Sequence, residues 1–422
     1  MHTPGRLAVV LISGLIAASS LAIAPPASAN GDCPSWFAGR GTGTPADPYQ
    51  VSVPLDIEEI GYCLSASFIQ MNDVALTGTW APLGTSGQPF TGTYDGGGFS
   101  ISNLNISLST TDDVGLFGYI SGATITGVNI ISGSVTSREY VGAIVGRAVN
   151  SSITQSSSAA SVSGVNQVGG IVGESAWATG PNRSLSQIFA TGAVTASGNY
   201  VGGLAGVTTS LVISNTYATG SVSGDYQVGG LIGENNSSSL SNSYAIGRVT
   251  SGGPDRAHGG VMGQESAGTY SGVTWDVDTT GESIPNYPVP AAIEGNTTTA
   301  MKSIATFRDL GWSIGSLWTG NTTWVICPQA NNGYPFLSAF YTAQTAPCIN
   351  RSGPPPDVDQ QVGRTAGQDC ATAGNAELNI GGVASGSWGQ SWAQWMNGAT
   401  GGFVCNRTLY YNMAYGRWEV RT

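Results

Sequence analysis

The sequence predicts an all-β protein built as a right-handed parallel β-helix, a solenoid with capped ends and a small C-terminal module tied by a disulfide. Two phrases that recur in register predict the solenoid. A Val-Gly phrase that ends in Gly, such as VGGIVG, begins at Val114, Val141, Val168, Val201, Val228 and His258. A second phrase follows in five of these six units, as in YATGSV at 217–222. The steps between the starts of the first phrase, 27, 27, 33, 27 and 30 residues, identify an internal repeat.

The residue types within each unit favour strands over helices. Short blocks of Val, Ile, Leu and Tyr are interrupted by Gly, Ser, Asn and Thr, which is typical of strands and turns. A step of 27 residues divides into three short strands and three corners, one turn of a β-helix. In the second phrase of the first unit, 130–135, the alternation of side chains along a strand places Ile131, Gly133 and Val135 on one face and Ser134 and Thr136 on the other. The right-handed path follows from the general preference for right-handed parallel crossovers.

The flanking segments define the domain organisation. Residues 1–29 have the pattern of a secretory signal peptide, with an apolar run before Ala27-Ser28-Ala29; a membrane anchor is the alternative. No later stretch is apolar for long enough to span a bilayer, so no transmembrane segment is expected after signal removal. We assign the remaining segments as N-terminal cap and first turns (30–113), repeats (114–281), C-terminal cap region (282–349), Pro-rich linker (350–366) and small Cys/Trp-rich module (367–422).

The N-terminal cap is expected to protect the first open edge of the solenoid. Residues 54–64 are predicted to contain a short helix with Asp56 as its N-cap.

Charge and cysteine content bound the partners and the compartment. The chain has 14 Lys and Arg against 25 Asp and Glu, a balance that disfavours nucleic acid and anionic lipid as partners. Six cysteines in an exported protein indicate three disulfides, for which fifteen pairings exist. Their clustering favours near neighbours: Cys33 with Cys63, Cys327 with Cys348, and Cys370 with Cys405.

The repeated phrases resemble a known family. VGG phrases followed by text such as NTYATGSVSG (215–224) are similar to the GLUG-motif repeats of bacterial secreted and surface, adhesin-like proteins. Residues 41–51 and 79–106 resemble the segment that precedes such repeats, and 273–281 and 331–337 the segment that follows them. The resemblance implies a building module of adhesin-like proteins that also occurs beside the protease domain of certain immunoglobulin A peptidases. It specifies a fold more than a function.

No catalytic motif, metal site or cofactor site is predicted, so we expect a non-enzymatic protein. A zinc protease needs a His-Glu-x-x-His helix or a similar ligand cluster, and the chain has only His2 and His258. A Ser-His-Asp or Cys-His site would have to use His258, which stands where Val begins the other repeats. A polar substitution in a terminal turn explains His258 better.

Two carboxylate pairs bear on this expectation. Asp276 and Asp278, two residues apart on a strand, would share one face and suit acid–base chemistry or calcium, but a structural turn is favoured. Asp112 and Asp113 are expected to solvate a loop. Lys302 is the only lysine, which disfavours a lyase.

Two features are candidates for binding. Trp388, Trp392 and Trp395 follow an i, i+4, i+7 spacing and are candidate glycan-binding residues; the alternative is that they form the core of the small module. In the rod, outward columns form a hydroxyl strip that suits ice or crystalline polysaccharide, although a hydrated solenoid wall is favoured. Its members are Ser134/Thr136, Ser161/Ser163, Ala193/Thr195, Ser221/Ser223 and Arg248/Thr250.

These observations together predict a secreted, non-catalytic, adhesin-like or cell-envelope-associated protein. Its expected partner is a cell-wall or extracellular glycan, or a surface protein. The alternatives are a polysaccharide hydrolase or lyase with its site in a groove along the rod, and a purely structural spacer.

Overall fold

The computed structural model describes most of the chain. It covers residues 39–176, 184–252, 257–285, 293–342 and 345–348, with Cys33, Phe37 and the backbone of 377–379, 406–412 and 417–421. These last three segments are β36 (Glu377–Asn379), β37 (Asn406–Asn412) and β38 (Arg417–Arg421), in which β37 pairs parallel to β36 and antiparallel to β38. Several predictions lie outside the described residues: the signal peptide, the linker, the pair Cys370 and Cys405, and Trp388, Trp392 and Trp395.

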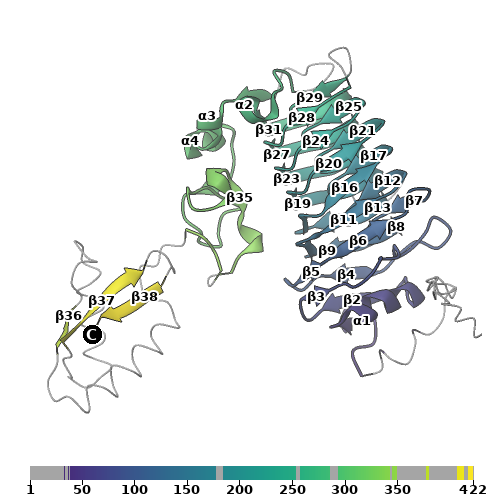
Figure 1. Ribbon diagram of the computed structural model, residues 1–422, viewed down its shortest axis with the longest axis horizontal. Helices are drawn as coiled ribbons and strands as arrows, with labels where there is room; N and C mark the ends of the chain where they lie inside the picture. The colour runs from purple at the N-terminus through teal and green to yellow at the C-terminus, as the bar shows by residue number, and fades with distance from the viewer. Residues whose placement is uncertain are drawn as a thin grey trace, which may run out of the picture.

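The rod is a parallel β-helix whose turns stack into long sheets (Figure 1). Three sheets have six strands each. Sheet I contains β6 (Leu104–Ser107), β11 (Gly133–Thr136), β16 (Ser161–Gly164), β20 (Val194–Ala196), β24 (Val222–Ser223) and β28 (Val249–Thr250). Sheet II contains β7 (Asp112–Val114), β12 (Glu139–Gly142), β17 (Asn166–Gly169), β21 (Asn199–Gly202), β25 (Tyr226–Gly229) and β29 (His258–Gly259). Sheet III contains β8 (Phe117–Ser121), β13 (Val145–Val149), β18 (Val172–Ala176), β22 (Ala205–Thr209), β26 (Ile232–Asn236) and β30 (Met262–Ser266).

Sheet IV has 14 strands and runs the length of the rod. It contains β1 (Tyr49–Val51), β2 (Ser67–Gln70), β3 (Val74–Ala75), β4 (Thr93–Asp95), β5 (Ser100–Ser102), β9 (Thr124–Thr126), β10 (Asn129–Ile130), β14 (Ser152–Thr154), β15 (Ser157–Ser158), β19 (Ser184–Ala190), β23 (Val212–Ala218), β27 (Ser239–Ala245), β31 (Thr269–Asp276) and β32 (Glu294–Asn296).

The repeated phrases occupy equivalent places in successive turns, as predicted. Val141 lies opposite Val114 on one side and Val168 on the other. These valines point into the interior, where burial of apolar surface stabilises the fold. Five of them have an exposed fraction of 0%: Val114, Val141, Val168, Val201 and Val228.

Each turn contains more strands than the three expected. The Val-Gly phrase is not one strand, because the chain bends at its centre: Gly142 ends β12 and Val145 begins β13. A Cβ at Gly142 would lie 2.3 Å from the Val145 carbonyl oxygen, so this bend needs glycine. The predicted alternation is also wrong at Ile131, which is 50% exposed. Ile131 lies in the corner between β10 and β11. Alternation of inward and outward side chains does not continue through a corner, so the pattern of β11 does not extend back to Ile131.

The N-terminal cap contains the predicted helix with a different cap residue. Helix α1 (Pro54–Glu59) is followed by the 3-10 helix η2 (Ile60–Tyr62), and Val53 is the N-cap of α1. Asp56 instead lies inside the first turn of α1 and accepts hydrogen bonds from the backbone nitrogens of Ser52 (2.7 Å) and Val53 (3.1 Å). A disulfide joins Cys33 to Cys63 at this end.

The region after the repeats covers both the end and one flank of the rod. At the end, the backbone nitrogen of Gly260 donates to Ile284 (2.9 Å), and β32 adds to sheet IV beside β31. The chain then returns along sheet IV as a segment that we call the clasp, residues 298–342 (Figure 1). The clasp contains α3 (Thr298–Met301), α4 (Ile304–Asp309), β33 (Ile314–Gly315), β34 (Trp324–Val325), η3 (Asn331–Gly333), β35 (Phe336–Leu337) and η4 (Ser338–Phe340).

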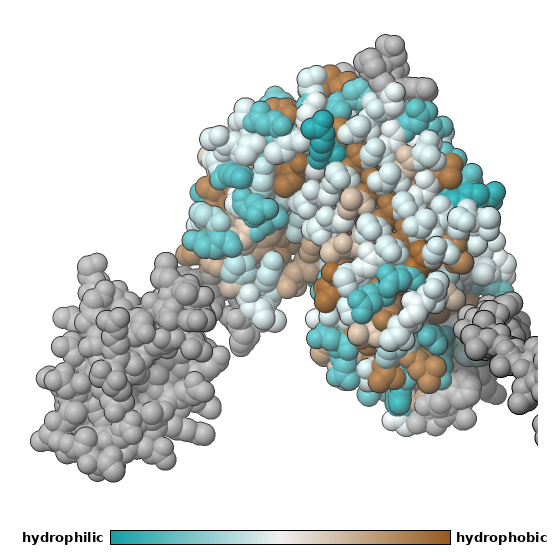
Figure 2. Space-filling model, viewed as in Figure 1, coloured by the Kyte–Doolittle hydropathy of each residue, from teal (hydrophilic) through white to brown (hydrophobic). Residues whose placement is uncertain are grey.

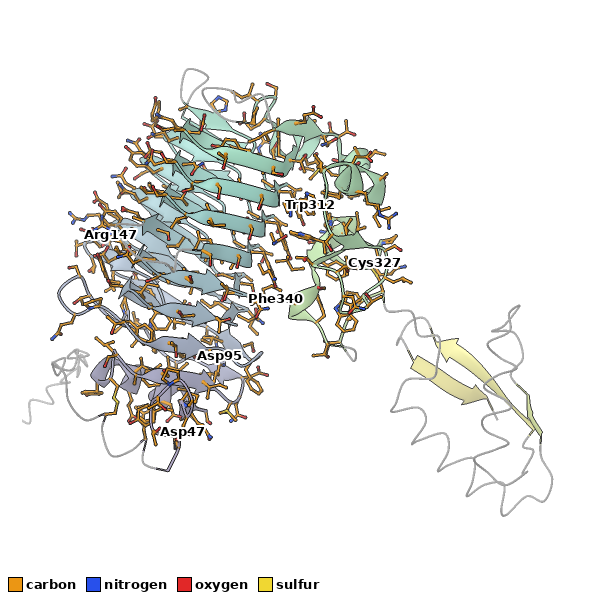
Figure 3. All side chains as sticks on the ribbon, turned by 180° about the vertical axis from the view of Figure 1, so that it is seen from behind. Asp47, Asp95, Arg147, Trp312, Cys327 and Phe340 are labelled. Atoms are coloured by element: carbon orange, nitrogen blue, oxygen red, sulfur yellow. A yellow bond between two sulfur atoms is a disulfide. The ribbon has the colours of Figure 1, made fainter. Side chains whose placement is uncertain are left out.

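Aromatic side chains join the clasp to the rod. Phe189, Tyr217 and Tyr244, on β19, β23 and β27, stack with ring centroids 4.7 and 5.1 Å apart. Trp324 of the clasp packs on both tyrosines, 5.9 Å from each ring. Figure 3 shows Trp312 and Phe340 in the space between the two ribbons. A second disulfide, Cys327–Cys348, lies in this region.

One face of the molecule is described by the hydropathy of its residues. Figure 2 shows one face as mostly pale, with small apolar and polar groups scattered over it. In the part of the chain that the structure describes, no helix has the length and apolar character needed to cross a membrane.

Candidate functional site

Asp276 has a structural role. It ends β31 and is the N-cap of α2 (Val277–Thr280), accepting hydrogen bonds from the backbone nitrogens of Asp278 (2.9 Å) and Thr279 (3.1 Å). The hydroxyls of Thr298 (2.8 Å) and Tyr334 (2.7 Å) also donate to this fully buried carboxylate. Burial and this bond raise the pKa of Tyr334 to about 12. Asp278 lies in α2 rather than on the strand, so Asp276 and Asp278 do not form a pair on one strand face.

His258 also lies at the end of the repeats. Its Nδ1 is 2.7 Å from Oε2 of Glu282, and its side chain is 21% exposed. It pairs with Val228 in sheet II, in the place where the other turns have Val. Burial raises the pKa of the Glu282 carboxyl, and the nearby His258 partly offsets this shift.

The hydroxyl strip lies on sheet I in the predicted register. Thr136 lies opposite Ser163, Ser163 opposite Thr195, and Ser223 opposite Thr250. Thr136 and Ser163 share a hydrogen bond of 2.9 Å. The strip is regular, and its hydroxyls lie on the outer surface of sheet I.

A second array of side chains, which we call the polar seam, lies where sheets II and III meet; its members are partly exposed except for the buried Val207 and Gln227. Its sheet II column consists of the residue before each buried Val, and its sheet III column consists of the residue after the last Gly of each phrase. The sheet II column is Asp113, Tyr140, Gln167, Tyr200 and Gln227; the sheet III column is Tyr119, Arg147, Glu174, Val207, Glu234 and Gln264.

The backbone brings the two columns together. All five residues of the sheet II column have φ between 49° and 63°, in the left-handed region; four of them, all except Asp113, are Tyr or Gln, which seldom adopt it. Within one turn, the Arg147 guanidinium lies 3.8 Å from the ring centroid of Tyr140. Between turns, Nε2 of Gln227 donates to Oε1 of Gln264 at 2.8 Å.

Charge is concentrated in the first turns of the seam. Arg147 donates to Glu174 of the next turn at 3.2 Å, and these side chains are 28% and 20% exposed. Beside them, Arg138 binds both carboxylate oxygens of Asp112. Burial raises the pKa of Asp113, while Arg147 lowers it in part. Burial likewise raises the pKa of Glu234. In Figure 3, Arg147 lies on the edge of the rod opposite Trp312 and Phe340 of the clasp.

The seam also holds acceptor atoms without a hydrogen bond. Among the described residues, three buried side-chain oxygens have no partner: Asp113 Oδ1, Gln167 Oε1 and Thr322 Oγ1. Two of the three belong to the sheet II column of the seam. Buried polar atoms usually have a hydrogen-bond partner. Two buried acceptors without one in the same column therefore mark the seam as a candidate ligand site.

Sequence reasoning missed this site. The sequence predicts that Asp112 and Asp113 solvate a loop, but both lie in β7, and Asp113 is half-buried. The sequence feature that indicates the seam is the residue before each Val-Gly pair, which is Asp, Tyr, Gln, Tyr and Gln in five successive turns. A polar or aromatic residue repeated at one position of a solenoid marks an outward column.

The polar seam offers aromatic rings, amide and carboxylate acceptors and one guanidinium along a line. Among the described residues, no group of three or more His, Cys, Asp or Glu side chains is placed to hold a metal ion.

Comparisons with known proteins agree with the fold and the repeat. The model of the GLUG motif matches residues 224–250. Halomucin from Haloquadratum walsbyi is 32% identical over 150 residues, which are 32% of this chain and 2% of that protein. A solved structure from Bacteroides ovatus, provisionally named an immunoglobulin A1 protease, has a TM-score of 0.58 at 20% identity and covers 72% of this chain and 96% of its own. At that identity the likeness concerns the fold alone. The chain therefore carries the GLUG motif, and the matched copy forms one turn of its parallel β-helix, from β25 to β28.

Proposed function

We propose that this chain is an extracellular, surface-associated protein of adhesin-like type that holds a glycan without changing it chemically. The observation that carries the proposal is the placement of its outward side chains. Each turn adds about 4.8 Å along the axis. Residues at one position of the repeat therefore form straight columns, on sheet I and along the polar seam. A straight array of polar and aromatic groups is complementary to a linear polymer.

The disulfides support the proposed location. Cys33–Cys63 and Cys327–Cys348 are both formed, and stable disulfides are typical of oxidising compartments outside the cytosol.

The experiment is a pull-down of the full chain on peptidoglycan, chitin, cellulose and starch. We expect retention on at least one of these glycans. A triple variant, Trp388→Ala with Trp392→Ala and Trp395→Ala, runs beside the wild type to separate the C-terminal module from the rod. Loss of retention in the variant would assign binding to that module, and unchanged retention would assign it to the rod. Failure of the wild type to bind any glycan would overturn the proposal.

One observation favours a second candidate, a carbohydrate-active enzyme. Asp113 is a half-buried carboxyl with a raised pKa beside Arg147, and groups with perturbed pKa values are enriched in active sites. The test is the release of reducing ends or of unsaturated products from soluble polysaccharides. Turnover that disappears in Asp113→Asn would support the enzyme, and no turnover on any substrate that the chain binds would exclude it.

A further inference from the structure

We propose that the polar seam is the glycan-binding site of the rod and that it takes an extended, neutral glycan lying parallel to the rod axis. The proposal rests on the proposed function and specifies its site and ligand class.

The first argument is the need for hydrogen-bond donors. Asp113 Oδ1 and Gln167 Oε1 are buried acceptors without a partner among the described residues, and they lie on β7 and β17, two strands apart in sheet II. Both oxygens are closed to solvent in this conformation, so a ligand can satisfy them only if the Asp113 and Gln167 side chains rotate toward it and it offers donors at intervals along the axis. The hydroxyls of successive sugar residues are such donors.

The second argument is the spacing of the aromatic rings. Tyr140 and Tyr200 lie on either side of Gln167 in the same column, so about 9.6 Å separates them along the axis. Both are half-buried, and the Arg147 guanidinium occupies one face of the Tyr140 ring, so a sugar can contact this ring only through its other face or its edge. An aromatic ring on each side of an amide acceptor suits a polymer with alternating ring faces and hydroxyls.

The third argument is charge. The seam and its neighbours carry five carboxylates, Asp112, Asp113, Glu139, Glu174 and Glu234, and two guanidiniums, Arg138 and Arg147, which gives a formal charge of 2 − 5 = −3. The whole chain has a net charge of −11. Sulfated or uronic-acid polymers would be repelled, so a neutral glycan is favoured.

The fourth argument concerns peptides. A peptide strand commonly binds by adding to the free edge of a sheet. Strands β12, β17 and β21 each pair with a neighbour on both sides, so the seam has no free edge along these turns. Recognition must use side chains, which the seam supplies.

The test measures affinity of the full chain for chito-, cello- and malto-oligosaccharides and for heparin by calorimetry. The seam variants are Gln167→Ala and Tyr200→Ala. Their controls, Ser163→Ala and Thr195→Ala, lie on sheet I in the same two turns. We expect at least tenfold weaker binding in each seam variant, unchanged binding in the controls, binding close to wild type in Tyr200→Phe, and none to heparin.

The outcomes separate the two proposals. If the wild type binds neutral glycans and the seam variants bind as tightly, the seam is not the site, although the proposed function stands. If the wild type binds none, the proposed function fails. Tighter binding of heparin than of the neutral glycans would overturn the ligand class.

A measurement on the wild type covers the case in which a seam variant does not fold. Hydroxyl-radical footprinting with saturating oligosaccharide should protect Tyr140 and Tyr200. Equal labelling of both tyrosines with and without ligand would overturn the assignment.

Discussion

Gly146 lies directly against the backbone of Val114 in the preceding turn. A Cβ at Gly146 would come within 2.2 Å of the Val114 nitrogen. The last glycine of the later phrases has the same surroundings, because a Cβ at Gly173, Gly206, Gly233 or Gly263 would meet backbone of the preceding turn at 2.2 to 2.5 Å. This glycine therefore allows each strand of sheet III to pack on sheet II of the turn before, and it forms the floor of the polar seam.

Substitution of one of these glycines should unfold the rod more easily. We expect Gly206→Ala to lower the free energy of unfolding by about 3 kcal/mol, since backbone atoms on the facing strand cannot move aside. Denaturant titration followed by circular dichroism measures the change. Gly87→Ala is the matched control, because a Cβ there meets nothing within 4 Å. Similar losses in both variants would contradict this account.

The clasp should depend on Trp324. This side chain is fully buried, and its Nε1 donates to Oδ1 of Asn215 on the rod at 3.1 Å. Truncation by Trp324→Ala leaves a cavity and should cost about 4 kcal/mol. We expect limited proteolysis to cut within 298–342 much faster than in the wild type. Leu317→Ala, in the same segment but 40% exposed, should be cut at the wild-type rate; unchanged protection in the Trp324 variant would be inconsistent with a packed clasp.

Asp276 should affect stability rather than binding. Asp276→Ala removes the cap of α2 and leaves the hydroxyls of Thr298 and Tyr334 without their acceptor, so a loss of about 2–4 kcal/mol is expected. Thermal unfolding measures the loss, and glycan affinity of the folded variant should not change. Asp309→Ala, on the exposed surface of α4, serves as the control and should alter the free energy of unfolding by less than about 0.5 kcal/mol. A weaker affinity at unchanged stability would instead indicate that Asp276 contacts the ligand.

Asp113 should make stability depend on pH. Burial raises its pKa in the folded state above the ordinary value of 3.8, so the folded chain binds this proton more tightly than the unfolded chain. The contribution of this carboxyl to stability is then fully present below pH 3.8 and is lost as pH rises through the folded pKa. Asp113→Asn, which stays neutral, should be more stable than the wild type at pH 7 and lose this advantage in acid. Parallel stability curves for the two proteins between pH 3 and 7 would refute this assignment of the pKa shift.

The repeat determined the architecture from the sequence alone. Each repeat of 27 residues has buried Val and closely packed Gly at fixed positions. Successive turns can therefore stack only with equivalent positions of the repeat aligned, as Val141 is with Val168. Local alternation within each strand therefore predicted the hydroxyl columns of sheet I correctly. The near-neighbour pairs Cys33–Cys63 and Cys327–Cys348 were also predicted from the sequence. The entropic cost of closing a loop grows with its length, so pairing is favoured between cysteines that are close in the chain.

Only the tertiary structure decided how the turns bend and what lies against them. The packing of sheet III on sheet II depends on contacts between backbone atoms of adjacent turns, as at Gly146 and Val114, and no single unit contains both partners. The clasp packs on Tyr217 and Tyr244, which are 107 and 80 residues before Trp324 (324 − 217 and 324 − 244). The polar seam also depends on the tertiary structure. The left-handed backbone at Tyr140 and the close packing at Gly146 bring the Tyr140 ring and the Arg147 guanidinium into contact.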